Sequence, residues 1–291
     1  MVHVVGTIVS TDIDELMDVD AIVGHWATAY IPLMNDGLGN ELGVDGLAGA
    51  KVLVVGASSG IGRAFASAAL RGAAQVCVAA RREAALLELC SAHGGGQVIV
   101  GDVAKDGDCR MIVDAAAAAM GGLDLVLFAV GVTSLAPIEA SSASDWSRDY
   151  AVNVIGATQI TIAALRHLSP DGVIAYLSSE ITGEPRWGLS SYMASKCALD
   201  ATIRAWRLEH PQRRFTRVVM GATIGTDFAN DFDGPTLEMA MQRWGASGID
   251  SALMDVDKVG IQLVRTLGVM WTMPEVDIPD IQLDPRGMAF D

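Results

Sequence analysis

The sequence predicts an α/β protein built on an open, doubly wound parallel sheet of about seven strands, with helices on both faces. From residue 51 onward, short strand-like segments alternate with longer helix-like segments. Such alternation is typical of parallel strands joined by right-handed helical crossovers. The strand-like segments are continuous apolar runs, which indicates strands that are covered on both faces.

The elements follow one another in a regular order. The first expected strand is the apolar run Lys51-Val-Leu-Val-Val55, which ends at a glycine. The expected strands are residues 51–55, 75–79, 97–100, 123–129, 172–177 and 216–220. The expected helices are residues 60–72, 82–92, the alanine-rich stretch 106–120, 144–168 and 190–209.

The first 48 residues lie outside this alternation and are interpreted as an N-terminal extension to a main domain over residues 49–291. Residues 3–12 resemble residues 217–227, and residues 26–36 resemble residues 244–257. The extension can be the remnant of the tail of a second, similar module that ends in a glycine-rich linker. Chance similarity remains the alternative.

Composition limits the classes of function. The chain has 20 basic and 35 acidic residues, a net charge of −15, which disfavours nucleic-acid and membrane-surface roles. The five histidines and four cysteines show no metal-binding spacing, so no metal site is expected. The sequence shows no secretory signal and no apolar stretch of about 20 residues. A soluble, cytoplasmic protein is therefore expected.

A glycine run, Gly56-Ala-Ser-Ser-Gly-Ile-Gly62, follows the first strand and opens a helix. Glycine permits the sharp turn and lets the backbone approach a pyrophosphate, and the helix N-terminus then presents free N–H groups to it. The serine hydroxyls can donate further hydrogen bonds. The cofactor contacts expected here are Gly56, Ser58, Ser59, Gly60, Ile61 and Gly62.

The second strand is followed by Arg81 and Arg82, where a cofactor with a free ribose 2′-hydroxyl usually meets an acidic residue. A guanidinium fork suits the additional phosphate of NADP, so NADP is preferred over NAD. Alternatively, these arginines only begin the next helix, in ion pairs with Glu83 or Glu88.

Tyr192 and Lys196 lie four residues apart in an expected helix, on one face, and Ser179 lies thirteen residues before the tyrosine at the end of a strand. A phenol has a pKa near 10 and needs a downward shift of about 3 units to exchange protons near neutral pH. One ammonium supplies about 1–3 units. A positively charged nicotinamide ring could supply the remainder.

These motifs resemble the short-chain dehydrogenase/reductase family, classical type, with its Rossmann-like fold, over residues 49–291. The glycines of the 56–62 run match the family's nucleotide-binding glycines, and residues 276–283 resemble its final strand. The resemblance implies a catalytic tetrad of Asn153, Ser179, Tyr192 and Lys196. It also implies cofactor contacts from Asp102, Val103, Gly131, Ile224, Thr226, Tyr192 and Lys196.

Two segments depart from the family pattern. The usual Asn-Asn-Ala-Gly is Phe128-Ala-Val-Gly131 here, which puts the polar tethering of the central sheet in doubt. The usual Pro-Gly after the sixth strand is Gly221-Ala222. Neither change removes a proton-transfer group.

The resemblance implies an NADP-dependent oxidoreductase, a carbonyl reductase or alcohol dehydrogenase that acts on a small, partly apolar substrate and forms a homodimer or homotetramer. Asp227 is interpreted as part of a solvated acidic loop. A non-catalytic NADP-binding sensor or scaffold remains an alternative. A dehydratase or epimerase is a weaker one, indicated only by Glu180 beside Ser179.

Overall fold

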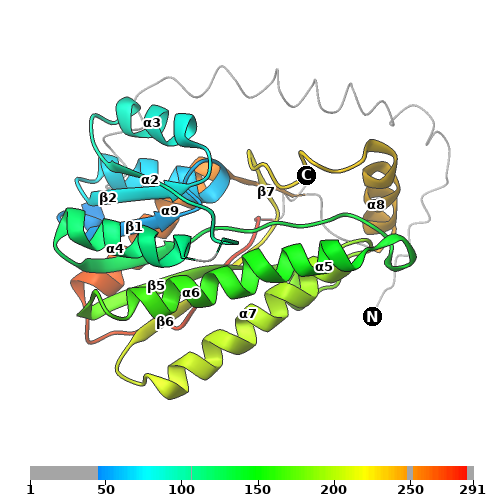
Figure 1. Cartoon of the computed structure of the whole chain (residues 1–291). Coiled ribbons are helices and arrows are strands. Elements are labelled where there is room, and N and C mark those ends of the chain that lie inside the picture. Colours follow the sequence, from blue (N-terminus) through cyan, green and yellow to red (C-terminus); the bar gives the residue numbers. More distant parts are fainter. Residues whose placement is uncertain (1–44, 106, 248–251, 287–291) are drawn as a thin grey trace, which may run out of the picture. The chain divides into compact units, whose positions relative to one another are not determined.

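The computed structural model describes residues 45–105, 107–247 and 252–286. Seven parallel strands form its central sheet in the order β3-β2-β1-β4-β5-β6-β9 (Figure 1). The strands are β1 (Lys51–Val55), β2 (Gln75–Ala80), β3 (Gln97–Val100), β4 (Leu123–Phe128), β5 (Leu168–Ser179), β6 (Arg214–Met220) and β9 (Asp280–Leu283). The predicted doubly wound parallel sheet is confirmed.

Helices cover both faces of this sheet. The bounds are α2 (Gly60–Arg71), α3 (Glu83–Ala92), α4 (Asp108–Met120), α5 (Ala143–Tyr150), α6 (Ala157–Ala164), α7 (Ser190–Glu209), α8 (Gly234–Ala246) and α9 (Val256–Thr272). Buried side chains of α2, α3 and α9 form one hydrophobic cluster with the sheet, and those of α4, α6 and α7 form another. Neighbouring residues of a strand point into opposite clusters, which is why each strand is apolar throughout. A two-stranded sheet of β7 (Thr223–Ile224) and β8 (Met254–Asp255) follows β6 in the chain.

The helix predicted over residues 144–168 is interrupted. Helix α5 passes into a π-helical segment, η4 (Ala151–Gly156), before α6 begins. The prediction of one uninterrupted helix was wrong at its end as well, because Leu168 already pairs with Leu123 as the first residue of β5. A π-helical turn widens the helix locally and is frequent at functional sites. This one contains Asn153.

The chain enters the fold through a short turn, η2 (Asp45–Leu47), that packs against α9. Leu47 is fully buried. A Cβ atom on Gly268 would lie 2.6 Å from the carbonyl carbon of Gly46, so glycine is required for this close approach. The proposed remnant of a second module lies, up to residue 44, outside the described residues.

Within residues 45–105, 107–247 and 252–286, the structure contains no helix that combines the length and apolar character needed to cross a membrane. The same residues contain no group of three or more His, Cys, Asp or Glu side chains arranged to hold a metal ion.

Candidate active site

A cleft of about 710 Å³ opens at the carboxyl ends of the central strands. Its walls come from the ends of β1 and β5 and from the loops after β2, β3, β4 and β6. In the sheet, β2 and then β3 lie on one side of β1, whereas β4 and the later strands lie on its other side. The strand order therefore reverses between β1 and β4. This edge therefore contains the switch point at which open parallel sheets bind ligands.

The glycine run forms a tight cradle on one side of the cleft. Gly56 has φ +95°, and a Cβ there would lie 2.9 Å from the carbonyl carbon of Ala129. A Cβ on Gly62 would lie 2.3 Å from the carbonyl oxygen of Gly56. Side chains at either position would push the loop away from its neighbours. The backbone can therefore come close to a ligand at the N-terminus of α2, as a dinucleotide pyrophosphate requires.

Arg82 closes the adjacent end of this cradle. Its guanidinium donates to the hydroxyls of Ser58 (3.1 and 3.0 Å) and Ser59 (2.6 Å). It also forms an ion pair with Asp227 at 2.8 Å. The hydrogen bond from Ser59 and the contact with Arg82 hold the pKa of Asp227 below its usual value. Asp227 is exposed, as expected for a solvated loop, but it is also ion-paired, and Arg82 pairs with neither Glu83 nor Glu88 among the described contacts.

Most of the remaining expected cofactor contacts also line the cleft, namely Ser58, Ser59, Gly60, Ile61, Arg81, Asp102, Val103, Gly131 and Thr226. Thr226 lies against the glycine run, because a Cβ on Gly60 would be 3.5 Å from its side chain. Two expected contacts lie elsewhere. Gly62 is buried behind the run, and Ile224 in β7 is half-exposed and does not line the cleft.

Three of the four predicted catalytic side chains meet in the floor of the cleft. Ser179 ends β5, while Tyr192 and Lys196 lie one turn apart on α7. The Nζ atom of Lys196 donates to the carbonyl oxygen of Leu177 at 2.8 Å and lies 5.7 Å from the centroid of the Tyr192 ring. The strand end and the helix thus bring a hydroxyl, a phenol and an ammonium group to one place.

Burial dominates the proton affinities of these groups. It raises the pKa of Tyr192 to about 12, and a hydrogen bond from Ser179 only partly opposes the shift. Burial also lowers the pKa of Lys196 to about 8. In the protein alone, the neighbouring lysine therefore does not bring the phenol toward neutral pH, contrary to the expectation from their spacing.

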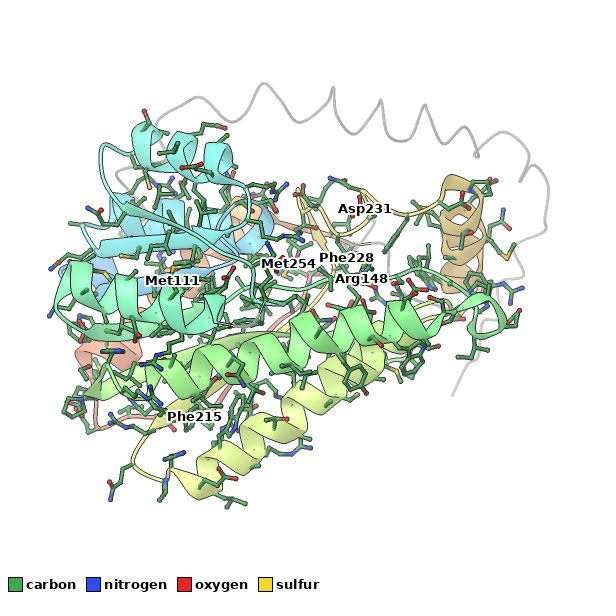
Figure 2. All side chains as sticks on the ribbon, viewed as in Figure 1. Met111, Arg148, Phe215, Phe228, Asp231 and Met254 are labelled. Carbon is green, nitrogen blue, oxygen red and sulfur yellow. The ribbon has the colours of Figure 1, made fainter. Side chains whose placement is uncertain are left out.

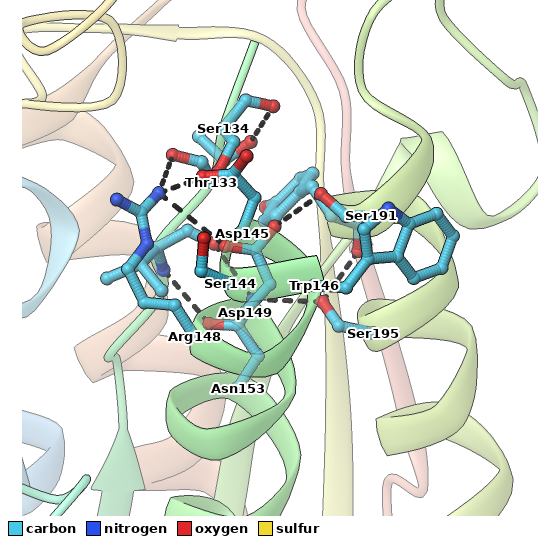
Figure 3. A network of polar contacts seen from close by, with 12 residues as sticks. Thr133, Ser134, Ser144, Asp145, Trp146, Arg148, Asp149, Asn153, Ser191 and Ser195 are labelled. Carbon is cyan, nitrogen blue, oxygen red and sulfur yellow. Dashed lines mark hydrogen bonds and ion pairs between the residues drawn. The ribbon is translucent and has the colours of Figure 1, made fainter. Parts of the chain in front are cut away.

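Asn153 lies behind the cleft and clamps its wall. Its Oδ1 accepts from the backbone N–H of Val132 at 2.9 Å, and its Nδ2 donates to the carbonyl oxygen of the same residue at 2.9 Å. Nδ2 also donates to Ser195, whose hydroxyl donates to the carbonyl oxygen of Tyr192 (Figure 3). The segment after Gly131 is therefore tethered by this amide, although the family's paired asparagines are absent there.

The same network contains a buried carboxylate that sequence reasoning missed. Asp149 is fully buried, and its Oδ2 accepts from the hydroxyl of Ser191 at 2.7 Å (Figure 3). Burial raises its pKa, and Ser191 opposes this shift. The neighbouring Arg148 donates to the carbonyl oxygen of Thr133 at 2.6 Å and lines the cleft. Asp149 and Ser191 meet only because α5 packs against α7, so no sequence motif indicates them.

The other end of the cleft is partly aromatic. The ring of Phe228 meets that of Tyr192 edge-on at 5.4 Å. Trp244 of α8 donates its indole N–H to the carbonyl oxygen of Trp187 at 3.0 Å, which holds α8 against the loop before α7. Figure 2 shows Arg148, Phe228 and Asp231, which all line the cleft, in the region between the sheet and α8.

Comparison with known proteins agrees with this geometry. The family model described as short chain dehydrogenase matches residues 50–233. Glucose 1-dehydrogenase of Gluconobacter oxydans is 34% identical over 190 residues, which are 62% of this chain and 71% of the relative. The 11-beta-hydroxysteroid dehydrogenase A of Sesamum indicum is 32% identical over 56% of this chain, and the match spans only 49% of that relative.

Solved structures show the same fold. A short-chain dehydrogenase from Burkholderia cenocepacia, in complex with NADP, superposes with a TM-score of 0.70 at 24% identity and covers 82% of this chain and 97% of its own. An alcohol dehydrogenase from Thermococcus sibiricus, complexed with 5-hydroxy-NADP, superposes with a TM-score of 0.69 at 21% identity and covers 80% of this chain and 94% of its own.

Proposed function

Because the chain belongs to the short-chain dehydrogenase family, we propose that it is an oxidoreductase that exchanges a hydride between NADP(H) and a carbonyl or secondary alcohol. One observation supports this proposal most directly. Ser179, Tyr192 and Lys196 meet in the floor of the same cleft that contains the glycine cradle. A dinucleotide site and a proton-transfer group are thereby adjacent, as hydride transfer at a carbinol carbon requires.

Each catalytic side chain has a distinct role in this proposal. The Ser179 hydroxyl donates a hydrogen bond to the substrate oxygen, and Tyr192 gives that oxygen its proton during reduction. Lys196 holds ribose hydroxyls beside the phenol, and Asn153 fixes the wall at Val132. When bound, the nicotinamide supplies or accepts the hydride.

The proton affinities determine the pH dependence that we expect for the two reaction directions. With a pKa of about 12, the Tyr192 phenol keeps its proton across the neutral range and is ready to act as an acid. The reverse reaction needs the phenolate, whose population rises with pH. We therefore propose that Tyr192 is protonated for carbonyl reduction at pH 7, and that the rate of alcohol oxidation rises with pH.

The proposed activity is tested by following NADPH oxidation with a panel of aliphatic, cyclic and hydroxylated ketones. We expect turnover with at least one of them, and reversal with the matching alcohol and NADP⁺ at higher pH. Tight NADP binding without turnover of any carbonyl compound would instead identify a cofactor sensor.

The preference for NADP over NAD is proposed from Arg81 and Arg82, which line the cleft after β2. Two guanidinium groups suit a ribose 2′-phosphate. We expect Arg81→Asp to lower the ratio of kcat/KM for NADPH to that for NADH by about 10–100-fold, since a carboxylate repels the phosphate and accepts a bond from the free hydroxyl. Arg110→Asp is the matched control, because Arg110 lies on α4 and does not line the cleft. An unchanged ratio in Arg81→Asp would count against the assignment.

We further propose that residues 49–291 form the catalytic domain, that residues 1–48 are an extension whose last turn, η2, packs against α9, and that the protein forms a homodimer or homotetramer. Exposed Ile155 and Ile162, seven residues apart on the η4–α6 helix, support an apolar contact through this helix and α7.

A reducing, cytoplasmic location is proposed from the four free cysteines.

A further inference from the structure

An ion pair that belongs to neither the cofactor cradle nor the tetrad lies in the wall of the cleft. Glu180 directly follows Ser179, and Arg186 lies in the loop before α7. Arg186 Nη2 donates to Glu180 Oε1. The side chains are only 17% and 21% exposed for Arg186 and Glu180 respectively, and both line the cleft together with Tyr192. A substrate that reaches Tyr192 must therefore be compatible with a mostly buried pair of opposite charges.

The pair is electrostatically close to the reacting phenol. Burial raises the pKa of Tyr192 to about 12, and the positive charge of Arg186 is among the influences that act in the opposite direction. The Nε atom of Arg186 is buried and has no hydrogen-bond partner among the described residues. Because that atom is buried, a substrate in the cleft can meet only the terminal nitrogens of Arg186 and the carboxylate of Glu180.

Three kinds of substrate can be compared at this pair. A carboxylate beside Arg186 would place a second negative charge next to that of Glu180 in a mostly buried position, where like charges repel strongly. A ketone whose remaining atoms are all hydrocarbon would exclude water from both charges. It would replace none of the hydrogen bonds that the water had made, which is unfavourable. A hydroxyl group can donate to Glu180 and accept from Arg186 at once, so it leaves the pair intact.

We propose that the substrate carries a hydroxyl group on the carbon next to the reacting carbonyl, so that the protein reduces hydroxy ketones to vicinal diols. The inference rests on the proposed oxidoreductase function and names its substrate class. Glu180 and Arg186 select the neighbouring hydroxyl, while Ser179 and Tyr192 act on the carbonyl oxygen. The remainder of the substrate is apolar, because it lies against Phe228 and other apolar side chains of the cleft.

The test compares two ketones that differ by one hydroxyl group, 3-hydroxy-2-butanone and 2-butanone, with NADPH as the reductant. We expect kcat/KM to be at least about tenfold higher for the hydroxy ketone, since a hydrogen bond to a charged group contributes about 1.5–3 kcal/mol. The double variant Glu180→Gln, Arg186→Gln is expected to bring the ratio close to one. The matched control is Arg243→Gln, because Arg243 stacks on Trp187 at 4.7 Å but does not line the cleft.

A binding measurement separates this inference from the activity itself. In the Tyr192→Phe variant with NADP⁺ present, calorimetry should show tighter binding of 2,3-butanediol than of 2-butanol. Selective diol binding without turnover in the wild-type protein would support the inference and contradict the proposed activity. Equal kcat/KM for the two ketones, or a preference for acetoacetate over both, would overturn the inference and leave the activity standing.

Discussion

Tyr192→Phe is expected to lower kcat for ketone reduction by at least about 10²–10⁴-fold, the usual contribution of a positioned acid or base. The phenol lies in the floor of the cleft and keeps its proton at neutral pH, because burial raises its pKa to about 12. Phenylalanine keeps the ring and its edge-on contact with Phe228 but removes the proton. We therefore expect the dissociation constant for NADP, measured by fluorescence, to change by no more than about tenfold, since only one polar contact is lost.

A second buried tyrosine provides the matched control. Tyr176 lies in β5, is fully buried, and shares a 2.7 Å hydrogen bond with the Thr161 hydroxyl. It does not line the cleft. Tyr176→Phe should lower the free energy of unfolding by about 1 kcal/mol and leave kcat unchanged. If Tyr192→Phe kept more than a tenth of wild-type kcat, the proton would come from another group, and the assignment of Tyr192 would be wrong.

The fold was largely predictable because parallel strands have a strong sequence signal. Every strand between two helical layers must be apolar on both faces, as in Val52–Val55, where all four residues are buried. The failure at residues 144–168 has an equally physical cause. A π-helical turn changes the hydrogen-bonding pattern without changing the apolar composition, so it leaves no periodic trace in the sequence. The start of β5 was missed because Leu168 is followed by Ser169, Pro170 and Asp171, which are not typical strand residues.

The candidate site was predictable only where its residues are fixed by spacing along the chain. Tyr192 and Lys196 share a helix face, and the glycine run is one continuous segment that forms the turn between β1 and α2. The pairs Arg82–Asp227 and Asp149–Ser191 join distant parts of the sequence and depend on the packing of whole elements. The spacing also overestimated the effect of Lys196 on the phenol. The spacing of two residues in a helix does not show how deeply they are buried. Burial disfavours the charged form of both side chains and is the largest influence on the pKa of each.

The hydrogen bonds of Asn153 explain how this chain can depart from the family pattern at residues 128–131. Asn153 bonds both the N–H and the carbonyl oxygen of Val132, so the wall after β4 is fixed by main-chain contacts. The side chains at Ala129 and Val130 therefore need no polar group for this purpose. Instead, the small side chain of Ala129 permits the glycine run to approach, since a Cβ on Gly62 would lie 3.0 Å from the Cβ of Ala129.

Gly62→Ala is expected to abolish most cofactor binding and to destabilise the protein. The added Cβ would lie 2.3 Å from the Gly56 carbonyl oxygen and 2.9 Å from its carbon, so the backbone of the cradle must move. Overpacking typically costs about 1–3 kcal/mol, which corresponds to a fall in Tm of roughly 2–12 °C for a domain of this size. A displaced cradle no longer presents the N-terminus of α2 to a pyrophosphate.

The decisive measurement is the stabilisation by NADP rather than Tm alone. A ligand at 100 times its Kd stabilises a protein by about 2.7 kcal/mol, so the wild-type protein should show a clear upward shift in Tm at that concentration. The variant should show almost none, even though it folds. Gly245→Ala in α8 is the control, because a Cβ there has no neighbour within 4 Å, and its NADP-induced shift should match the wild type. If NADP raised the Tm of Gly62→Ala by as much as that of the wild type, the dinucleotide would not bind at this cradle. A ligand that contacts the cradle backbone would bind more weakly once that backbone had moved.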